Sequence, residues 1–202
     1  MPVVDIPPHF EERVVCSIAA AVHYQIPANL VLAVAEIENG KPGQWVSNTN
    51  GTHDVGSMQF NTSYLRELAR YGITASDVAA AGCYSFDLAA WRLRGHIKND
   101  KGDLWTRAAN YHSRTPQYNA VYRAKLRAKA SKWADWLEAR FVTVDVTKAG
   151  AVPSMPTTLS EVQPVQAQTV KVDDAPTAKQ AATASLNTSG YVPRKIYATG
   201  QQ

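Results

Sequence analysis

A glutamate ends a strongly apolar segment of the chain. Residues 30–37 are aliphatic apart from Glu36, and Glu38 follows them directly. Pro27 precedes this segment, and Asn39 and Gly40 follow it, as is typical of a helix start and a helix stop. The helix is apolar nearly all round, so we expect it to be buried.

The position of Glu38 suits acid catalysis. Burial and the negative end of the helix dipole would both raise the pKa of its carboxyl, although Lys41 would oppose this if it folded back. A carboxyl that stays protonated near neutral pH can donate a proton to a glycosidic oxygen. Glu36 competes for this role, but residues two apart point to nearly opposite helix faces, so only one should line a site. Both could also be ordinary helix-end residues.

The elements that would position Glu38 are helices. Residues 10–141 show successive helical patterns with short polar breaks and no strand pattern of useful length, which predicts a mainly α fold. The other helices that we expect follow Asn61 as far as Gly72, follow the capping box at Thr74 as far as Gly82, cover about residues 85–99, and start at Thr115-Pro116.

The composition changes after Phe141. Residues 142–202 are rich in Ala, Thr, Val, Pro, Gln and Ser, so we expect a low-complexity, disordered tail, with residues 1–9 as an N-terminal extension. The end of the tail, from Tyr191 to Tyr197, mixes aromatic and basic residues. It is either a short docking motif or an uncoupled chain end.

The cysteines exclude two kinds of site. Cys16 and Cys83 are too few and too widely spaced for a zinc cluster or a CxxC redox motif, so no metal is expected. The residues alone leave two free thiols and one disulfide equally open.

Three segments, the first of which starts at Glu38, resemble known catalytic motifs. They are Glu38-Asn-Gly-Lys-Pro-Gly43, then Ser47-Asn48 and the segment to Asn61 that contains Gly56-Ser-Met-Gln59, and lastly residues 108–116 with Tyr111. In this order they resemble lytic transglycosylases with a goose-lysozyme-like domain, over about residues 10–141. The best match is to the specialised branch that accompanies conjugation and type IV secretion systems.

The resemblance implies a lysozyme-like helical domain in which Glu38 is catalytic. Substrate-binding residues would be Ser47, Met58, Gln59, Asn61 and Tyr111. Ser47 would orient the Glu38 carboxyl, Gln59 would bind an N-acetyl group or a ring hydroxyl, and Met58 would wall the groove. Tyr111 would face the acid. This chain departs from many members by having Asn39 directly after the acid and His112 after the motif tyrosine, and we interpret His112 as structural, with substrate contact as the alternative.

The implied reaction uses one acid and no metal or cofactor. It cleaves the bond between N-acetylmuramic acid and N-acetylglucosamine in peptidoglycan and forms a 1,6-anhydro ring. Asp54, in a turn rich in Gly and Asn, is interpreted as a structural cap rather than as a second catalytic carboxylate. One alternative is a goose-type lysozyme that transfers the glycan to water. Another is a non-catalytic scaffold that binds peptidoglycan through the basic residues 123–132 or the tail.

The formal charge of +4 and the pI near 9.1 favour an anionic partner such as peptidoglycan or nucleic acid. Nucleic acid is disfavoured because no reader motif surrounds the basic residues. The resemblance implies a periplasmic monomer with a Cys16–Cys83 disulfide, whose tail could contact secretion-system components. No apolar stretch is long enough to span a membrane. The N-terminus lacks a secretory signal, and we expect that a presequence was removed rather than never present.

Overall fold

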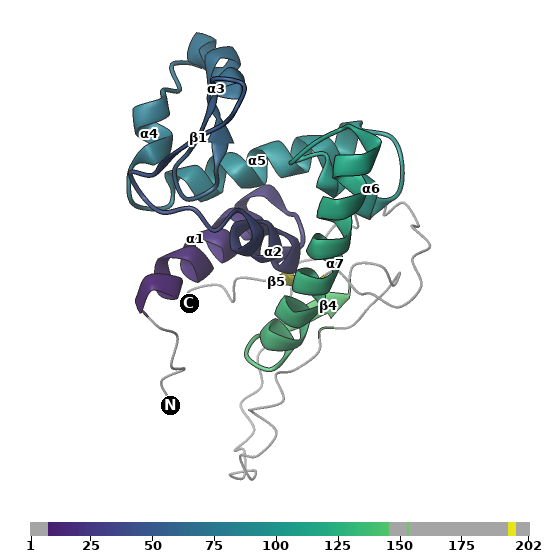
Figure 1. Cartoon of the computed structure of the whole chain (residues 1–202). Coiled ribbons are helices and arrows are strands. Elements are labelled where there is room, and N and C mark those ends of the chain that lie inside the picture. Colours follow the sequence, from purple (N-terminus) through teal and green to yellow (C-terminus); the bar gives the residue numbers. More distant parts are fainter. Residues whose placement is uncertain (1–7, 146–152, 154–193, 197–202) are drawn as a thin grey trace, which may run out of the picture.

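The structure is a computed structural model that describes residues 8–145, 153 and 194–196. Helices dominate this part of the chain, as the sequence predicts (Figure 1). They are α1 (Pro8–Tyr24), α2 (Ala28–Glu38), α3 (Thr62–Leu68), α4 (Ala75–Ala79), α5 (Tyr84–Asn99), α6 (Leu104–Ala109) and α7 (Pro116–Glu138), with a 3-10 turn at Ala69–Tyr71.

Helix α2 is the centre of the fold. Its first eight residues are all buried, and its main neighbours are α1 and α7, which confirms the buried helix that the apolar run predicts. It ends where Asn39 adopts a left-handed conformation with φ of 46°, one that Asn tolerates better than most residues. Glu38 is therefore the last residue of a helix whose first eight residues are buried.

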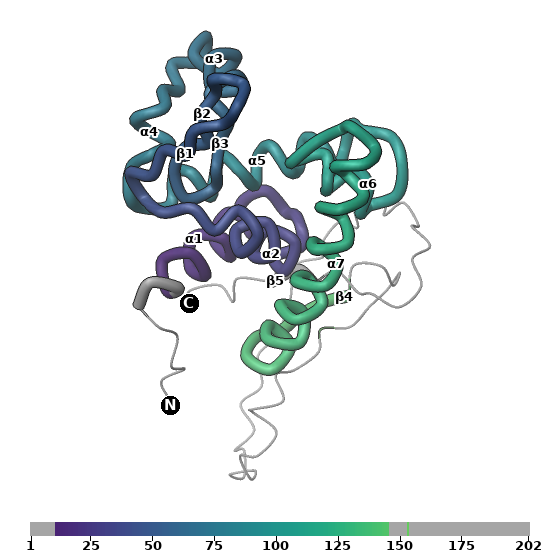
Figure 2. Tube along the Cα trace, viewed as in Figure 1, coloured from purple at the N-terminus to yellow at the C-terminus, as the bar shows by residue number. Residues whose placement is uncertain are grey.

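Helix α5 joins two parts of the molecule. Figure 2 shows α3, α4 and a small sheet above one end of α5, and α6 near its other end. The sheet contains β1 (Trp45–Ser47), β2 (His53–Val55) and β3 (Phe60–Asn61), paired antiparallel in that order. The sequence did not predict these strands, because two or three residues are too few to show an alternating pattern.

Local signals elsewhere identified most helix boundaries. Thr74 and Asp77 form the expected capping box at the start of α4, with both reciprocal hydrogen bonds present. Helix α6 was not predicted, because its six residues are too few to show a helical period. Thr115 precedes α7 as expected but makes no side-chain capping bond.

A disulfide joins α1 to the start of α5. Cys16 and Cys83 are bonded, with their Cα atoms 4.9 Å apart, so the structure favours the disulfide over two free thiols. The bond connects segments that are 67 residues apart in the chain and holds the N-terminal helix against the helix below the small sheet.

The predicted end of the helical domain, at Phe141, lies before strand β4. Strand β4 (Thr143–Asp145) is buried and pairs antiparallel with β5 (Arg194–Ile196), which also contacts α1 and α2. For these six residues the expectation of a disordered tail is wrong. Three-residue strands gain order from the partner strand and from the surface that they cover, neither of which is visible in local composition. Tyr191 and Tyr197 of the suggested docking motif lie outside the described residues.

No helix among the described residues is long and apolar enough to cross a membrane.

Candidate active site

The carboxyl of Glu38 is half-buried at the end of α2. The hydroxyl of Tyr122, on α7, donates a hydrogen bond of 2.6 Å to its Oε1. Tyr122 is itself only 4% exposed, so this donor is fixed by the core. The contact orients the carboxyl at the place where α2 meets α7.

Burial raises the pKa of Glu38 to about 7. The Tyr122 hydrogen bond and the positive charge of Arg92 lower this pKa, whereas the negative charge of Asp54 raises it. Lys41 is exposed, and its backbone N–H donates to Gln44. Glu38 is therefore partly protonated at neutral pH, which a group that first gives and then takes a proton requires.

Glu36 faces a different environment. Its two oxygens accept hydrogen bonds from Lys129 Nζ at 2.5 Å and from Trp133 Nε1 at 2.8 Å, both on α7. It does not line the cleft around Glu38. Of the two glutamates, only Glu38 lines this cleft.

Two cavities meet at Glu38 and form one cleft. The larger, of about 620 Å³, lies towards the sheet and α5, and the smaller, of about 290 Å³, lies along α7. Glu38, His112 and Tyr118 line both. The larger part is also lined by Asn48, Thr49, Asn50, Asp54, Gln59, Asn61, Arg92, Tyr111 and Ser113. The cleft can therefore hold a polar, extended ligand that passes over the carboxyl.

Close backbone contact brings two parts of the motif together. A Cβ at Gly40 would lie 2.1 Å from the carbonyl oxygen of Gly56, so the loop after α2 can pack there only without a side chain. Gln59 adopts a positive φ of 48° in the same turn, and its Nε2 donates to the Gly56 carbonyl at 2.8 Å. This packing holds Gln59 in the cleft beside the end of α2.

Tyr111 and Asn61 also reach the cleft as expected. Tyr111 is 3% exposed, and its hydroxyl donates to the backbone carbonyl of Met58 at 3.1 Å. Asn61 caps α3 and donates through Nδ2 to Asp54 and Thr52, both at 2.9 Å. Each side chain is thus fixed by the protein before any ligand binds.

Met58 and Ser47 lie apart from this group. The Met58 side chain is fully buried in the core and lines neither cavity. Ser47 is exposed on β1, and among the described residues it makes no hydrogen bond to Glu38. Tyr122 has the orienting position that the resemblance implied for Ser47.

Three side chains in the cleft were not predicted as functional. Asp54 is a strand residue that lines the cleft, not a turn cap, and it accepts the bond from Asn61. Arg92 lies over the rings of Tyr64 and Tyr111, at 4.2 and 4.8 Å from their centroids. Tyr122 shares a face of α7 with Tyr118, four residues earlier. This spacing indicated the helix, but it did not indicate that Tyr122 contacts Glu38.

His112 lies flat against the ring of Tyr122, with ring centroids 4.9 Å apart and planes 3° from parallel. Burial lowers its pKa, so the ring is uncharged at neutral pH. Its place in both cavities supports the alternative of substrate contact, beside a structural role in holding Tyr122. The described residues contain no group of three or more His, Cys, Asp or Glu that could hold a metal ion.

Comparison with known proteins gives a family match and distant relatives. The model of the transglycosylase SLT domain matches residues 15–133. The chain is 28% identical over 133 residues to Protein IpgF of Shigella flexneri, covering 65% of this chain and 82% of the relative. It is 27% identical over 115 residues to Invasion protein IagB of Salmonella typhimurium (strain SL1344), covering 56% and 71%. With the family model matching more than half of its length, the chain belongs to the transglycosylase SLT family.

Proposed function

We propose that this protein is a peptidoglycan lytic transglycosylase in which Glu38 is the single acid and base. The observation that carries the proposal is a half-buried carboxyl with a pKa of about 7, fixed by Tyr122 in a polar cleft. The chain's membership of a transglycosylase family supports the same reaction class.

The reaction would proceed in two proton transfers. Protonated Glu38 gives its proton to the oxygen between N-acetylmuramic acid and N-acetylglucosamine, and the bond from that oxygen to C1 of the muramic acid breaks. The substrate's N-acetyl oxygen stabilises the positive C1. The Glu38 carboxylate then takes the proton of the muramic 6-hydroxyl, whose oxygen bonds to C1 and closes the anhydro ring. Glu38 ends protonated, ready for the next bond.

The proposed substrate-binding residues are Ser47, Met58, Gln59, Asn61 and Tyr111. Gln59, Asn61 and Tyr111 would contact sugar directly, since all three line the cleft with Glu38. Met58 would act indirectly, because its backbone carbonyl accepts the hydrogen bond that holds the Tyr111 hydroxyl in place. Ser47 would contact a longer glycan at the exposed edge of the sheet.

A hydrolase is the second candidate, and the placement of Asp54 favours it. Asp54 shares the larger cavity with Glu38, so a water held there could attack C1 in place of the 6-hydroxyl. Mass spectrometry of muropeptides released from purified sacculi separates the two reactions, because an anhydro product lacks one water. Anhydro ends support the transglycosylase, and reducing ends would contradict it. With the hydrolase, Asp54→Asn should stop the release of reducing ends.

The test of Glu38 uses Glu36 as its matched control. Glu38→Gln keeps the side-chain shape but cannot donate and recover a proton, so turnover should fall by at least about 10²- to 10⁴-fold. Glu36→Gln, two residues away, should leave the turnover nearly unchanged because Glu36 faces Lys129 and Trp133. A folded Glu38→Gln protein that still released anhydro-muropeptides at the normal rate would refute the assignment. Glycan binding without cleavage by the wild type would favour a scaffold.

The biological role that we propose is local opening of the cell wall for a secretion or conjugation apparatus, in the periplasm. The Cys16–Cys83 disulfide supports an oxidising compartment. The residues after Asp145 would contact components of the apparatus, and the chain would act as a monomer. Deleting residues 150–189, which leaves a connection between the paired strands β4 and β5, should then impair secretion in cells while purified protein still cleaves sacculi.

A further inference from the structure

A third cavity, of about 820 Å³, adjoins the cleft around Glu38. Asn61 and Arg92 line both spaces, so the wall of one passes directly into the wall of the other. The cavity extends along α5 to the connection between α6 and α7. A side branch of a ligand bound over Glu38 can therefore enter this cavity.

The walls of this cavity carry an excess of positive charge. Its basic residues are Arg92, Arg94, Lys98 and Arg114, against the two carboxylates of Glu67 and Asp100. Arg94 and Lys98 stand one turn apart on the same face of α5. Among the described residues, neither Arg94 nor Lys98 forms an ion pair with a carboxylate. Their donors are available to an anionic ligand.

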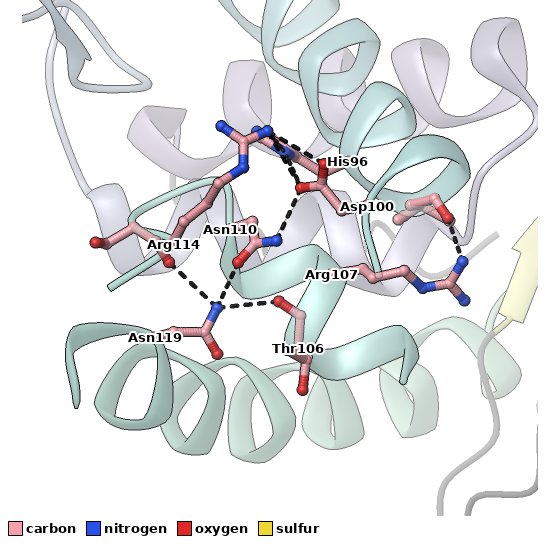
Figure 3. A network of polar contacts seen from close by, with 9 residues as sticks. His96, Asp100, Thr106, Arg107, Asn110, Arg114 and Asn119 are labelled. Carbon is pink, nitrogen blue, oxygen red and sulfur yellow. Dashed lines mark hydrogen bonds and ion pairs between the residues drawn. The ribbon is translucent and has the colours of Figure 1, made fainter. Parts of the chain in front are cut away.

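Arg114 is held in place by a polar network (Figure 3). Its Nη2 lies 3.1 Å from Oδ1 of Asp100, whose Oδ2 is 2.7 Å from His96 Nδ1 and 2.8 Å from Asn110 Nδ2. Burial opposes ionisation of Asp100, but the hydrogen bonds from Asn110, His96 and Arg114 lower its pKa to about 2. Asp100 is thus charged at any working pH. It fixes one guanidinium nitrogen and leaves the others of a mostly exposed side chain free to meet a ligand.

The floor of the cavity is open for a ligand chain. Gly95 lies on α5 between the basic residues, and a Cβ added there would meet no atom within 4 Å. Trp91, 44% exposed, lines the same wall and offers an apolar surface. Guanidinium groups bind carboxylates through paired hydrogen bonds, and the aromatic face suits short aliphatic side chains.

We infer that this basic cavity binds a carboxylate on the branch of muramic acid, either in its stem peptide or, where the peptide is absent, in its lactyl group. The inference rests on the proposed function, because it takes peptidoglycan as the ligand. It assigns to Arg94, Lys98 and Arg114 a selection for glycan that bears these acids. The cleft around Glu38 would then recognise the sugars, and the basic cavity their anionic branches.

The test compares two substrates and two matched double variants. One substrate is glycan with intact stem peptides, and the other is glycan stripped by an amidase, which removes the peptide and frees the lactyl carboxylate. Arg94→Gln/Lys98→Gln should raise the KM for peptide-bearing glycan by roughly 3- to 10-fold, without changing kcat. Arg70→Gln/Lys101→Gln removes the same charges from exposed positions that do not line the cavity and should change neither value.

The pattern of losses identifies the acid. A KM increase confined to peptide-bearing glycan assigns the stem peptide, and one confined to stripped glycan assigns the lactyl group, whose carboxyl is an amide until the peptide is removed. A KM increase on both substrates shows that the cavity accepts either carboxylate. An unchanged KM on both substrates, or the same KM increase in the control pair, would overturn the inference. Gly95→Leu fills the cavity without changing its charge, and it should cause a similar KM increase if the ligand enters there.

Calorimetry separates this inference from the proposed reaction. A soluble disaccharide tetrapeptide is titrated into Glu38→Gln protein, with and without Arg94→Gln/Lys98→Gln. Weaker binding in the triple variant supports the cavity even if the wild type cleaves nothing, in which case the proposed function alone fails. If binding is unchanged and the wild type cleaves normally, the cavity inference is refuted and the proposed function stands.

Discussion

The Tyr122 hydroxyl holds the Glu38 carboxyl at 2.6 Å although the two residues are 84 positions apart in the chain. The bond crosses from α7 to the end of α2, and His112 stacks on the Tyr122 ring. Donating to the carboxylate lowers the pKa of Glu38 against the larger effect of burial. One hydroxyl therefore affects both the position and the acidity of the proposed acid.

Tyr122→Phe should separate these two effects. Without the hydrogen bond the pKa of Glu38 rises further, so the alkaline limb of the kcat/KM profile should move to higher pH. The carboxyl also loses its orientation, so kcat should fall by roughly 10- to 100-fold. A pH series on purified sacculi measures both. Tyr84→Phe removes a hydroxyl from an exposed site away from the cleft and should change neither. An alkaline limb that stayed in place would show that Tyr122 does not act on the Glu38 carboxyl.

The disulfide between Cys16 and Cys83 should be a large part of the stability. Closing a loop of 67 residues constrains the unfolded chain and stabilises the fold by about 4 kcal/mol on the loop-entropy model. Urea unfolding with and without reductant measures this difference. Cys83→Ser, at an exposed position, should match the reduced wild type and be insensitive to reductant. If alkylation without reductant labelled both thiols in natively exported protein, the bridge would be absent from the natural form.

The sequence predicted what local patterns encode. The apolar run identified α2 and Glu38, and the Thr74 capping box identified α4, because each signal lies within a few residues. The Tyr122 hydrogen bond to Glu38 and the place of Asp54 in the same cleft depend on packing between α2, α7 and the sheet. No spacing along the chain encodes them. The resemblance implied that Gln59, Asn61 and Tyr111 share a cleft, but it also assigned the orienting role to Ser47, where the structure has Tyr122.

Strands β4 and β5 allow a test of what the C-terminal region does. A chain ending at Asp145 loses β5 and exposes the edge of β4, so its free energy of unfolding should fall by about 1–3 kcal/mol. All proposed catalytic residues lie upstream, so cleavage of sacculi should persist at temperatures where the protein stays folded. Deleting residues 197–202 keeps β5 and is the matched control. Loss of cleavage by a folded chain ending at Asp145 would place the C-terminal region in the substrate site.

The pKa of Glu38 also makes stability depend on pH. The folded state holds this proton more tightly than the unfolded chain, since its pKa rises from 4.5 to about 7. The stabilising contribution of the protonated carboxyl is complete below about pH 4.5 and is lost as pH rises through about 7. The loss is on the order of 3 kcal/mol. Glu38→Gln has no charge to bury, so it should be more stable than the wild type at pH 8, with the difference shrinking towards pH 4. Glu36→Gln should instead lose about 0.5–1 kcal/mol, because it breaks the half-exposed pair with Lys129. Thermal unfolding of the three proteins between pH 4 and 8 tests this, and parallel curves for wild type and Glu38→Gln would show that the carboxyl is not buried as the structure has it.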